Sequence, residues 1–122
     1  MTPEEIIKQD AKNMGADPEQ VLAGVNTAIH HGGKMLREND SLLLLTPLHG
    51  SKEHMFLHLF SVAQPSVALK NVQKFITRVR SMPGLKRVYG DTTNQQVIRL
   101  LTMSGIQVMK SDVPQFTWMA EV

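Results

Sequence analysis

Changes of hydrophobic period along one stretch of the chain restrict its fold more than any other feature. Residues 54–63 form a largely apolar, strand-like run, and residues 66–81 then repeat apolar positions at helical spacing. A second strand pattern follows at residues 86–90, and a second helical pattern at residues 94–104. A chain that changes period in this way needs both helices and strands in its core. We therefore predict a mixed α+β fold.

The remaining segments complete this picture at both ends. Thr2, Pro3 and Glu5 form a helix start signal, and Asp17 followed by Pro18 forms a second one. We therefore predict two N-terminal helices, three strands, a helix, a strand, a helix and two strands, all in one domain spanning residues 1–122. The outer strands are expected at residues 34–37, 41–48, 106–110 and 115–121.

Composition excludes several classes of function. The chain of 122 residues contains no cysteine, which excludes disulfides, thiol catalysis and thiolate metal sites. Its 13 basic and 11 acidic residues give a charge of +2, too small to indicate a nucleic-acid partner. No apolar run approaches the roughly 20 residues of a membrane span, and the acidic N-terminus is unlike a signal peptide. We expect a soluble protein, cytoplasmic or held in an assembly, and not secreted by a signal peptide.

A motif in the last helical segment points to a family. Asn94 begins it, Val97 lies three residues later, and Gly105 and Ile106 close it. This spacing resembles the signature N-x-x-A-x-x-x-Y-x-x-x-G-F of the GNAT superfamily of acyl-CoA-dependent N-acetyltransferases. Where the family has a tyrosine that serves as general acid, this chain has Leu101, which has no proton to give.

The resemblance implies a specific sheet and a specific ligand position. The strands that contain Phe60 and Val88 should be parallel neighbours that diverge at their C-terminal ends, near Ala63 and Gly90. In the family, acyl-CoA lies in this splay of the sheet. Its pantetheine arm pairs with the backbone of the first strand, and its pyrophosphate lies at the N-terminus of the next helix.

The loop that would hold the pyrophosphate departs from the family pattern Q/R-x-x-G-x-G/A. Gln64 fits the first position, but Val67 replaces the first glycine, and Pro65 removes a backbone donor. We expect Val67 to crowd a pyrophosphate, whereas Ser66 would cap the helix and contact an anion. If acyl-CoA binds, the expected contacts are Val62, Ala63, Gln64, Ser66, Val67, Ala68 and Asn94.

The family often places its catalytic base on the strand 54–63, where His58 is the candidate and Glu53 lies just before it. The backbone N–H of Val62 or Ala63 would then donate to the thioester carbonyl. The alternative for His58 is a buried, hydrogen-bonded histidine without a catalytic role. His54 and His58 would lie roughly 13 Å apart on a strand, too far to share one metal ion, so no metal site is expected.

Two functions remain open on this sequence. The first, which we favour, is a degenerate GNAT-fold protein with no cofactor, a structural component whose partners are proteins or a second copy. Small cysteine-free proteins of tailed bacteriophages look similar, which would make it virion-associated. The second is an active acetyl-CoA-dependent N-acetyltransferase acting on an unknown amine. Lys70, Lys74 and Arg78 form a basic stripe that is either a dock for an acidic partner or a solvated face.

Overall fold

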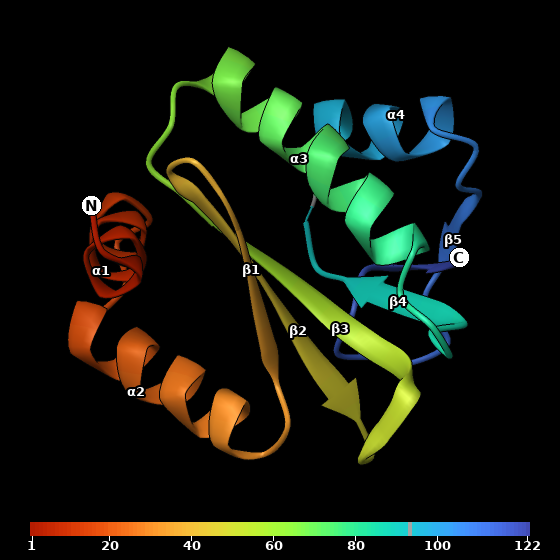
Figure 1. Cartoon of the computed structure of the whole chain (residues 1–122), viewed down its shortest axis with the longest axis horizontal. Helices are drawn as coiled ribbons and strands as arrows, with labels where there is room; N and C mark the ends of the chain where they lie inside the picture. Colours follow the sequence, from red (N-terminus) through yellow and green to blue (C-terminus); the bar gives the residue numbers. More distant parts are fainter. Residues whose placement is uncertain (93) are drawn as a thin grey trace.

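The computed structural model describes residues 1–92 and 94–122, and it shows one mixed sheet with helices on both faces (Figure 1). The predicted α+β fold is confirmed, in the predicted order of elements. Six strands form the sheet in the order β1-β2-β3-β4-β6-β5. The elements are α1 (Pro3–Asn13), α2 (Pro18–His30), β1 (Lys34–Glu38), β2 (Ser41–Leu48), β3 (Ser51–Ser61), α3 (Pro65–Arg80), β4 (Arg87–Gly90), α4 (Gln95–Met103), β5 (Val108–Lys110) and β6 (Trp118–Glu121).

Two tight hairpins build the first half of the sheet. β1 and β2 pair antiparallel around a two-residue turn in which Asn39 has φ 52°. β2 and β3 pair around His49 and Gly50, both with positive φ (52° and 73°), as hairpin turns with two central residues in the left-handed region require. β3 then pairs parallel with β4, which confirms the predicted neighbours, and β4, β6 and β5 continue antiparallel.

The sheet separates two hydrophobic clusters. One lies under α1 and α2 and contains Leu42, Leu44 and Phe60. The other lies under α3 and α4 and contains Leu43 and Leu45. β2 is buried on both sides, because its alternate side chains enter the two clusters. This explains why it reads as a continuous apolar run, and Figure 1 shows the helix pairs on opposite faces.

The predicted helix starts are confirmed at three of the four helices. Thr2 and Glu5 form a capping box on α1, Asp17 caps α2, and Asn94 caps α4. α3 differs from the prediction. It begins at Pro65, so Ser66 lies inside its first turn and does not cap it.

The observed bounds of three strands differ from the predicted ones. β3 begins at Ser51, earlier than predicted, and ends at Ser61, so Val62 and Ala63 follow the strand and do not belong to it. β5 and β6 are shorter than predicted, because residues near their N-terminal ends form turns and loops. Of the helices that the structure describes, none is long and apolar enough to cross a membrane.

Candidate functional site

The parallel strands β3 and β4 pair over a short distance only. Their register runs from His54 opposite Arg87 to Phe56 opposite Tyr89. β4 ends one residue later, whereas β3 continues to Ser61. The last five residues of β3 therefore have no strand partner on that side within the described part of the chain. This is the divergence that the sequence predicted.

A buried polar network fixes the end of β3 relative to α3. The Asn71 side chain, only 1% exposed, donates from Nδ2 to the Ser41 hydroxyl at 2.9 Å. That hydroxyl is 2.8 Å from the Ser61 hydroxyl, and Ser61 Oγ in turn accepts from the Ala63 N–H at 3.2 Å. Buried polar groups are costly unless bonded, so these contacts hold the strand end and the helix in one arrangement. Sequence reasoning missed Asn71.

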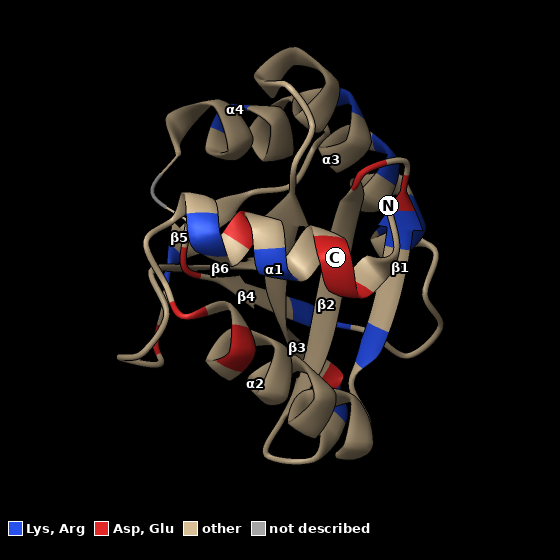
Figure 2. Cartoon of the chain, turned by 90° about the vertical axis from the view of Figure 1, so that its left-hand side faces the viewer, with Lys and Arg blue, Asp and Glu red and all other residues tan. Residues whose placement is uncertain are grey.

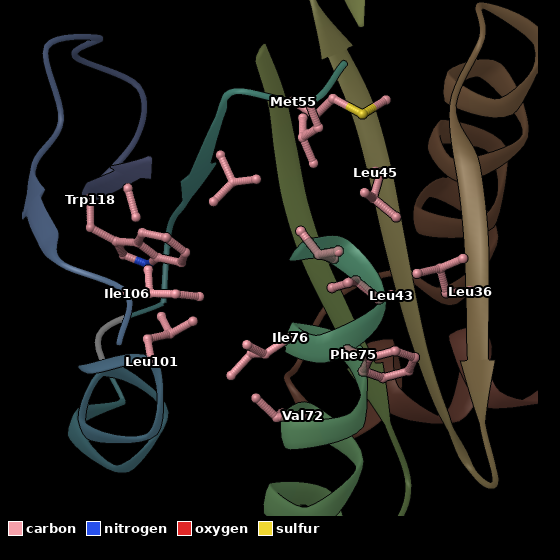
Figure 3. Close-up of a cluster of buried hydrophobic side chains, with 14 residues drawn as sticks. Leu36, Leu43, Leu45, Met55, Val72, Phe75, Ile76, Leu101, Ile106 and Trp118 are labelled. Carbon is pink, nitrogen blue, oxygen red and sulfur yellow. The ribbon is translucent and has the colours of Figure 1, made fainter. Parts of the chain in front are cut away.

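An apolar cavity of about 100 Å³ lies beside the divergence, between the sheet, α3 and α4. Figure 3 shows Trp118, Ile106 and Leu101 on one side of this region and Ile76 of α3 on the other. Asp91 is among the residues that line the cavity, and its side chain is half exposed. Its lining consists of Leu43, Leu57, Leu59, Val72, Phe75, Ile76, Val79, Val88, Gly90, Asp91, Thr92, Val97, Leu101, Ile106, Trp118 and Val122.

Trp118 forms part of the cavity wall and depends on a glycine. A Cβ on Gly90 would lie 2.2 Å from the indole ring, so only glycine at position 90 lets the tryptophan pack there. Trp118 is 6% exposed, and its Nε1 has no hydrogen-bond partner in the described structure. A buried donor left without an acceptor costs about 1–3 kcal/mol. Buried donors without a hydrogen-bond partner are few in native structures.

The N-terminus of α3 has the properties of an anion site. Gln64 occupies the N-cap position but makes no side-chain cap, and the first turn contains no acidic residue. The first backbone bond of the helix runs from Ala68 N–H to the Gln64 carbonyl at 2.8 Å. Pro65 has no N–H, so the N–H groups of Ser66 and Val67 are those left uncapped. Val67 is 41% exposed and contributes to neither core cluster.

His58 lies at the divergence on the other face of the sheet. Its Nδ1 is 3.8 Å from a carboxylate oxygen of Asp91, which is also among the residues that line the cavity. Because side chains alternate along a strand, His58 shares its face with Phe60 and lies opposite Leu57 and Leu59. The imidazole is 38% exposed, so His58 is partly buried.

A second carboxylate reaches the same strand from α1. Asp10 Oδ1 accepts the Ser61 backbone N–H at 3.1 Å. Burial raises the pKa of Asp10, while the bond from Ser61 and the nearby charge of His58 act in the opposite direction. The end of β3 is thus held by a carboxyl group that folding partly removes from water.

The remaining predicted residues are spread over the site and beyond it. Val62 N–H donates to the Asp40 carbonyl at 3.1 Å, and Ala63 N–H to Ser61, so neither is a free donor for a thioester carbonyl. Glu53 lies at the far end of β3, exposed and 3.6 Å from Lys86 Nζ, and is not near the divergence. The side-chain oxygen of Asn94 accepts a hydrogen bond from the Gln96 N–H at 2.9 Å, so Asn94 is a helix cap.

The register of β3 places one more backbone group at the divergence. Val62 bonds to the β1–β2 turn, and N–H directions alternate along an antiparallel strand. The backbone of Leu59 therefore faces away from β2. It lies three residues beyond the last β3–β4 pair, at Phe56. Leu59 thus offers a strand edge at the divergence.

An aromatic row along β3 was also missed. His54, Phe56, His58 and Phe60 occupy alternate positions, and Phe56 stacks on Phe116 with ring centroids 4.6 Å apart. Neighbouring rings in the row lie 4.5 to 6.1 Å apart between Phe56 and Phe60. The alternation was visible in the sequence, but the partner Phe116 comes from a loop far along the chain.

Charge is distributed unevenly over the surface. Figure 2 shows acidic and basic positions side by side on α1, and Lys and Arg positions gathered along α3 and β1. Lys70, Lys74 and Arg78 are all exposed, and Arg78 forms an ion pair with Glu38 at 3.4 Å. In residues 1–92 and 94–122, no three metal-binding side chains come together.

Comparisons with known proteins agree on the fold. No family model and no curated protein matches the chain. YncA of Salmonella typhimurium, provisionally named an acetyltransferase and solved with its cofactor acetyl-CoA, matches with a TM-score of 0.53 at 16% identity, over 87% of this chain and 72% of that chain. The microcin self-immunity acetyltransferase MccE, in complex with acetyl-CoA and AMP, matches with a TM-score of 0.53 at 8% identity, over 97% and 81%.

A third structure, a GNAT-family acetyltransferase from Streptococcus pneumoniae, has a TM-score of 0.48 at 12% identity over 85% of this chain and 74% of that chain, and supports no conclusion. At such low identity, similarity establishes the fold alone. The chain therefore has a GNAT-like fold, as its motif at Asn94 to Ile106 indicated.

Proposed function

We propose that this chain binds an acyl-CoA at the divergence of β3 and β4 and transfers its acyl group to an amine. The observation that carries the proposal is an apolar cavity at the divergence together with an uncapped helix N-terminus directly after β3. Structures with the same fold were solved with acetyl-CoA. We now prefer this proposal to a degenerate protein without cofactor, because the side chain of Val67 is exposed and the N-terminus of α3 has no cap.

The residues present fit the parts of such a molecule. The N–H groups of Ser66 and Val67, with the helix dipole, would hold the phosphates. Pro65 reduces the number of donors there, so we expect weaker phosphate binding than a glycine loop gives. The backbone edge at Leu59 and the apolar cavity would hold the pantetheine arm. A bound acyl-CoA would supply an acyl group activated as a thioester.

His58 is the residue we assign to proton transfer. It is near the divergence and opposite the cavity, so an amine could approach from its face of the sheet. A neutral imidazole would accept the amine proton, and Asp91 would stabilise the imidazolium that results. Leu101 is buried and cannot donate a proton to the leaving thiolate, which leaves water as the proton source.

A second candidate function rests on that same leucine. A buried Leu101 in place of the family tyrosine, with Val67 in place of glycine, is what a GNAT-fold component of a protein assembly would show. In that case the exposed stripe Lys70, Lys74 and Arg78 would be the contact surface, for an acidic protein partner or a second copy. A virion role, suggested by the resemblance to phage proteins, belongs to this candidate.

Calorimetric titration with acetyl-CoA separates the two. We expect saturable binding by the native chain, and we expect Ser66→Glu to weaken it at least about tenfold, because a carboxylate would compete with the phosphates at the helix N-terminus. The matched control is Gln73→Glu, which adds the same charge to the same helix at an exposed position farther along. Absence of heat at millimolar acetyl-CoA would favour the assembly component, whereas equal weakening by both variants would contradict phosphate binding at the N-terminus of α3.

A further inference from the structure

Two carboxylates lie near His58 at the divergence, one from α1 and one just after β4. Asp91 is 3.8 Å from His58 Nδ1, and the charge of His58 also acts on Asp10. Within residues 1–92 and 94–122, no lysine or arginine forms an ion pair with either carboxylate. We infer that Asp10 determines the substrate class of the proposed transfer, and that the acceptor is a diamine whose second, charged amino group binds to Asp10.

The hydrogen bond of Asp10 places this side chain at the free edge of β3. Val62 N–H bonds to the β1–β2 turn, so the N–H of Ser61, one residue earlier, points away from β2 and toward the divergence. Asp10 Oδ1 accepts that N–H at 3.1 Å. Because α1 covers the face of the sheet that carries Phe60, Asp10 reaches the divergence from the face of His58.

The second oxygen of Asp10 is open to a ligand. No described group donates a hydrogen bond to Oδ2, and the residue is only partly buried. The buried side-chain atoms without a partner in the described structure are Arg87 Nε and Trp118 Nε1, so Oδ2 is not a buried atom. Burial of the carboxyl group as a whole raises the pKa of Asp10, because the charged form loses hydration. An ammonium group at Oδ2 would compensate for that loss.

The charges at the divergence select among amines. A carboxylate on the acceptor, as in an amino acid, would be repelled by Asp10 and Asp91. A simple alkylamine would leave Asp10 without a charged partner once its amino group lies at His58. A diamine meets both needs, because one amine gives its proton to His58 while the other stays protonated and donates to Asp10.

The spacing along β3 limits the length of the diamine. His58 and Ser61 are three residues apart, which is roughly 10 Å along a strand. The side chain between them on this face is the buried Phe60, whose ring centroid is 4.5 Å from that of His58. An aromatic ring offers no partner to a polar linker. The two amino groups are therefore expected on a chain of several methylene groups that fits within this span.

This inference rests on the proposed function, because it names the acceptor of that transfer, and it adds no chemical step to it. Recognition of a cation by Asp10 is measurable without acetyl-CoA. The two proposals can therefore fail separately.

Three amines of matched length test the second charge. Cadaverine, hexylamine and 6-aminohexanoate share an aminopentyl group and end in an ammonium, a methyl and a carboxylate group. Without acetyl-CoA, we expect cadaverine to shift the backbone amide NMR signal of Ser61, whose N–H bonds to Asp10. Its affinity should exceed that of hexylamine at least about tenfold, as a charge-assisted hydrogen bond predicts, and 6-aminohexanoate should bind more weakly still. Equal affinities for cadaverine and hexylamine in the native chain would overturn the inference.

Asp10→Asn then removes the charge and keeps an oxygen for Ser61. We expect the ratio of cadaverine to hexylamine affinity to fall at least about fivefold. The matched control is Asp17→Asn, which removes a charge at the exposed N-cap of α2 and should leave the ratio unchanged. An unchanged ratio in Asp10→Asn, or an equal fall in both variants, would show that Asp10 does not select the ligand.

Thiol release from acetyl-CoA separates this inference from the proposed function. We expect kcat/KM for cadaverine to exceed that for hexylamine in the native chain, and the difference to shrink in Asp10→Asn. Cadaverine binding that depends on Asp10 but gives no thiol release would sink the proposed function and leave Asp10 as a cation-binding residue. Thiol release with hexylamine as fast as with cadaverine would sink this inference alone.

Discussion

Asp10 joins the first helix to the strand that borders the candidate site. Its carboxylate accepts the Ser61 N–H at 3.1 Å, and burial raises its pKa against the opposing effects of that bond and of His58. A carboxyl group with a raised pKa binds its proton more tightly in the folded state than in the unfolded chain. Its contribution to stability therefore falls as pH rises from the unfolded value, about 3.9, through the folded value.

Asp10→Asn should remove this dependence and keep an oxygen for Ser61. The unfolding free energy of the variant minus that of the wild type should become more positive as the pH rises from about 3 to about 7. Urea denaturation at several pH values measures it. Asp17→Asn is the matched control, because Asp17 is an exposed N-cap and asparagine caps about as well. A difference that shrinks as pH rises would show that the charged form of Asp10 stabilises the fold.

Phe75 is a side chain of α3 that packs against the sheet. It is 2% exposed and lies in the cluster under α3 and α4. Truncation to alanine should cost about 3–5 kcal/mol of unfolding free energy, through lost burial and the space left behind. Lys74→Ala, at the neighbouring exposed position, should change it by less than about 0.5 kcal/mol. A loss below about 1 kcal/mol for Phe75→Ala would contradict the packing described.

At the scale of elements, local signals explain what the sequence could predict. Thr2 with Glu5, Asp17 and Asn94 mark helix starts because the side chain of each accepts a hydrogen bond from a backbone N–H no more than three residues away. The hairpin turn at Gly50 was equally local, since positive φ is easiest for glycine. Such features depend on a few adjacent residues, so they are visible without the fold.

What the sequence could not predict depends on residues far apart in the chain. Asn71 read as one polar position in a helix, yet it is buried because Ser41 and Asn39 meet it there. The closeness of Trp118 and Gly90 and the stack of Phe56 on Phe116 likewise need the pairing of distant segments. The family motif supplied the location of the site but not these contacts.

At the scale of the whole molecule, the sheet joins two halves through one short ladder. α1, α2 and the hairpins of β1, β2 and β3 form one side, and β4, β6 and β5 form the other. The two halves share the three parallel pairs of β3 and β4, together with α3 packed across them. The divergence follows because β3 continues for five residues after that ladder. A site at this junction is lined by both halves.

The central claim is that acyl-CoA binds at this junction, and backbone amide NMR tests it most directly. Titration with acetyl-CoA should shift the amide signals of Leu59, Ser66 and Val67, which lie at the free strand edge and the uncapped helix N-terminus. Signals from α2 serve as an internal control and should stay in place. The account is contradicted if millimolar acetyl-CoA leaves those three amides unchanged, or shifts only the stripe of Lys70, Lys74 and Arg78.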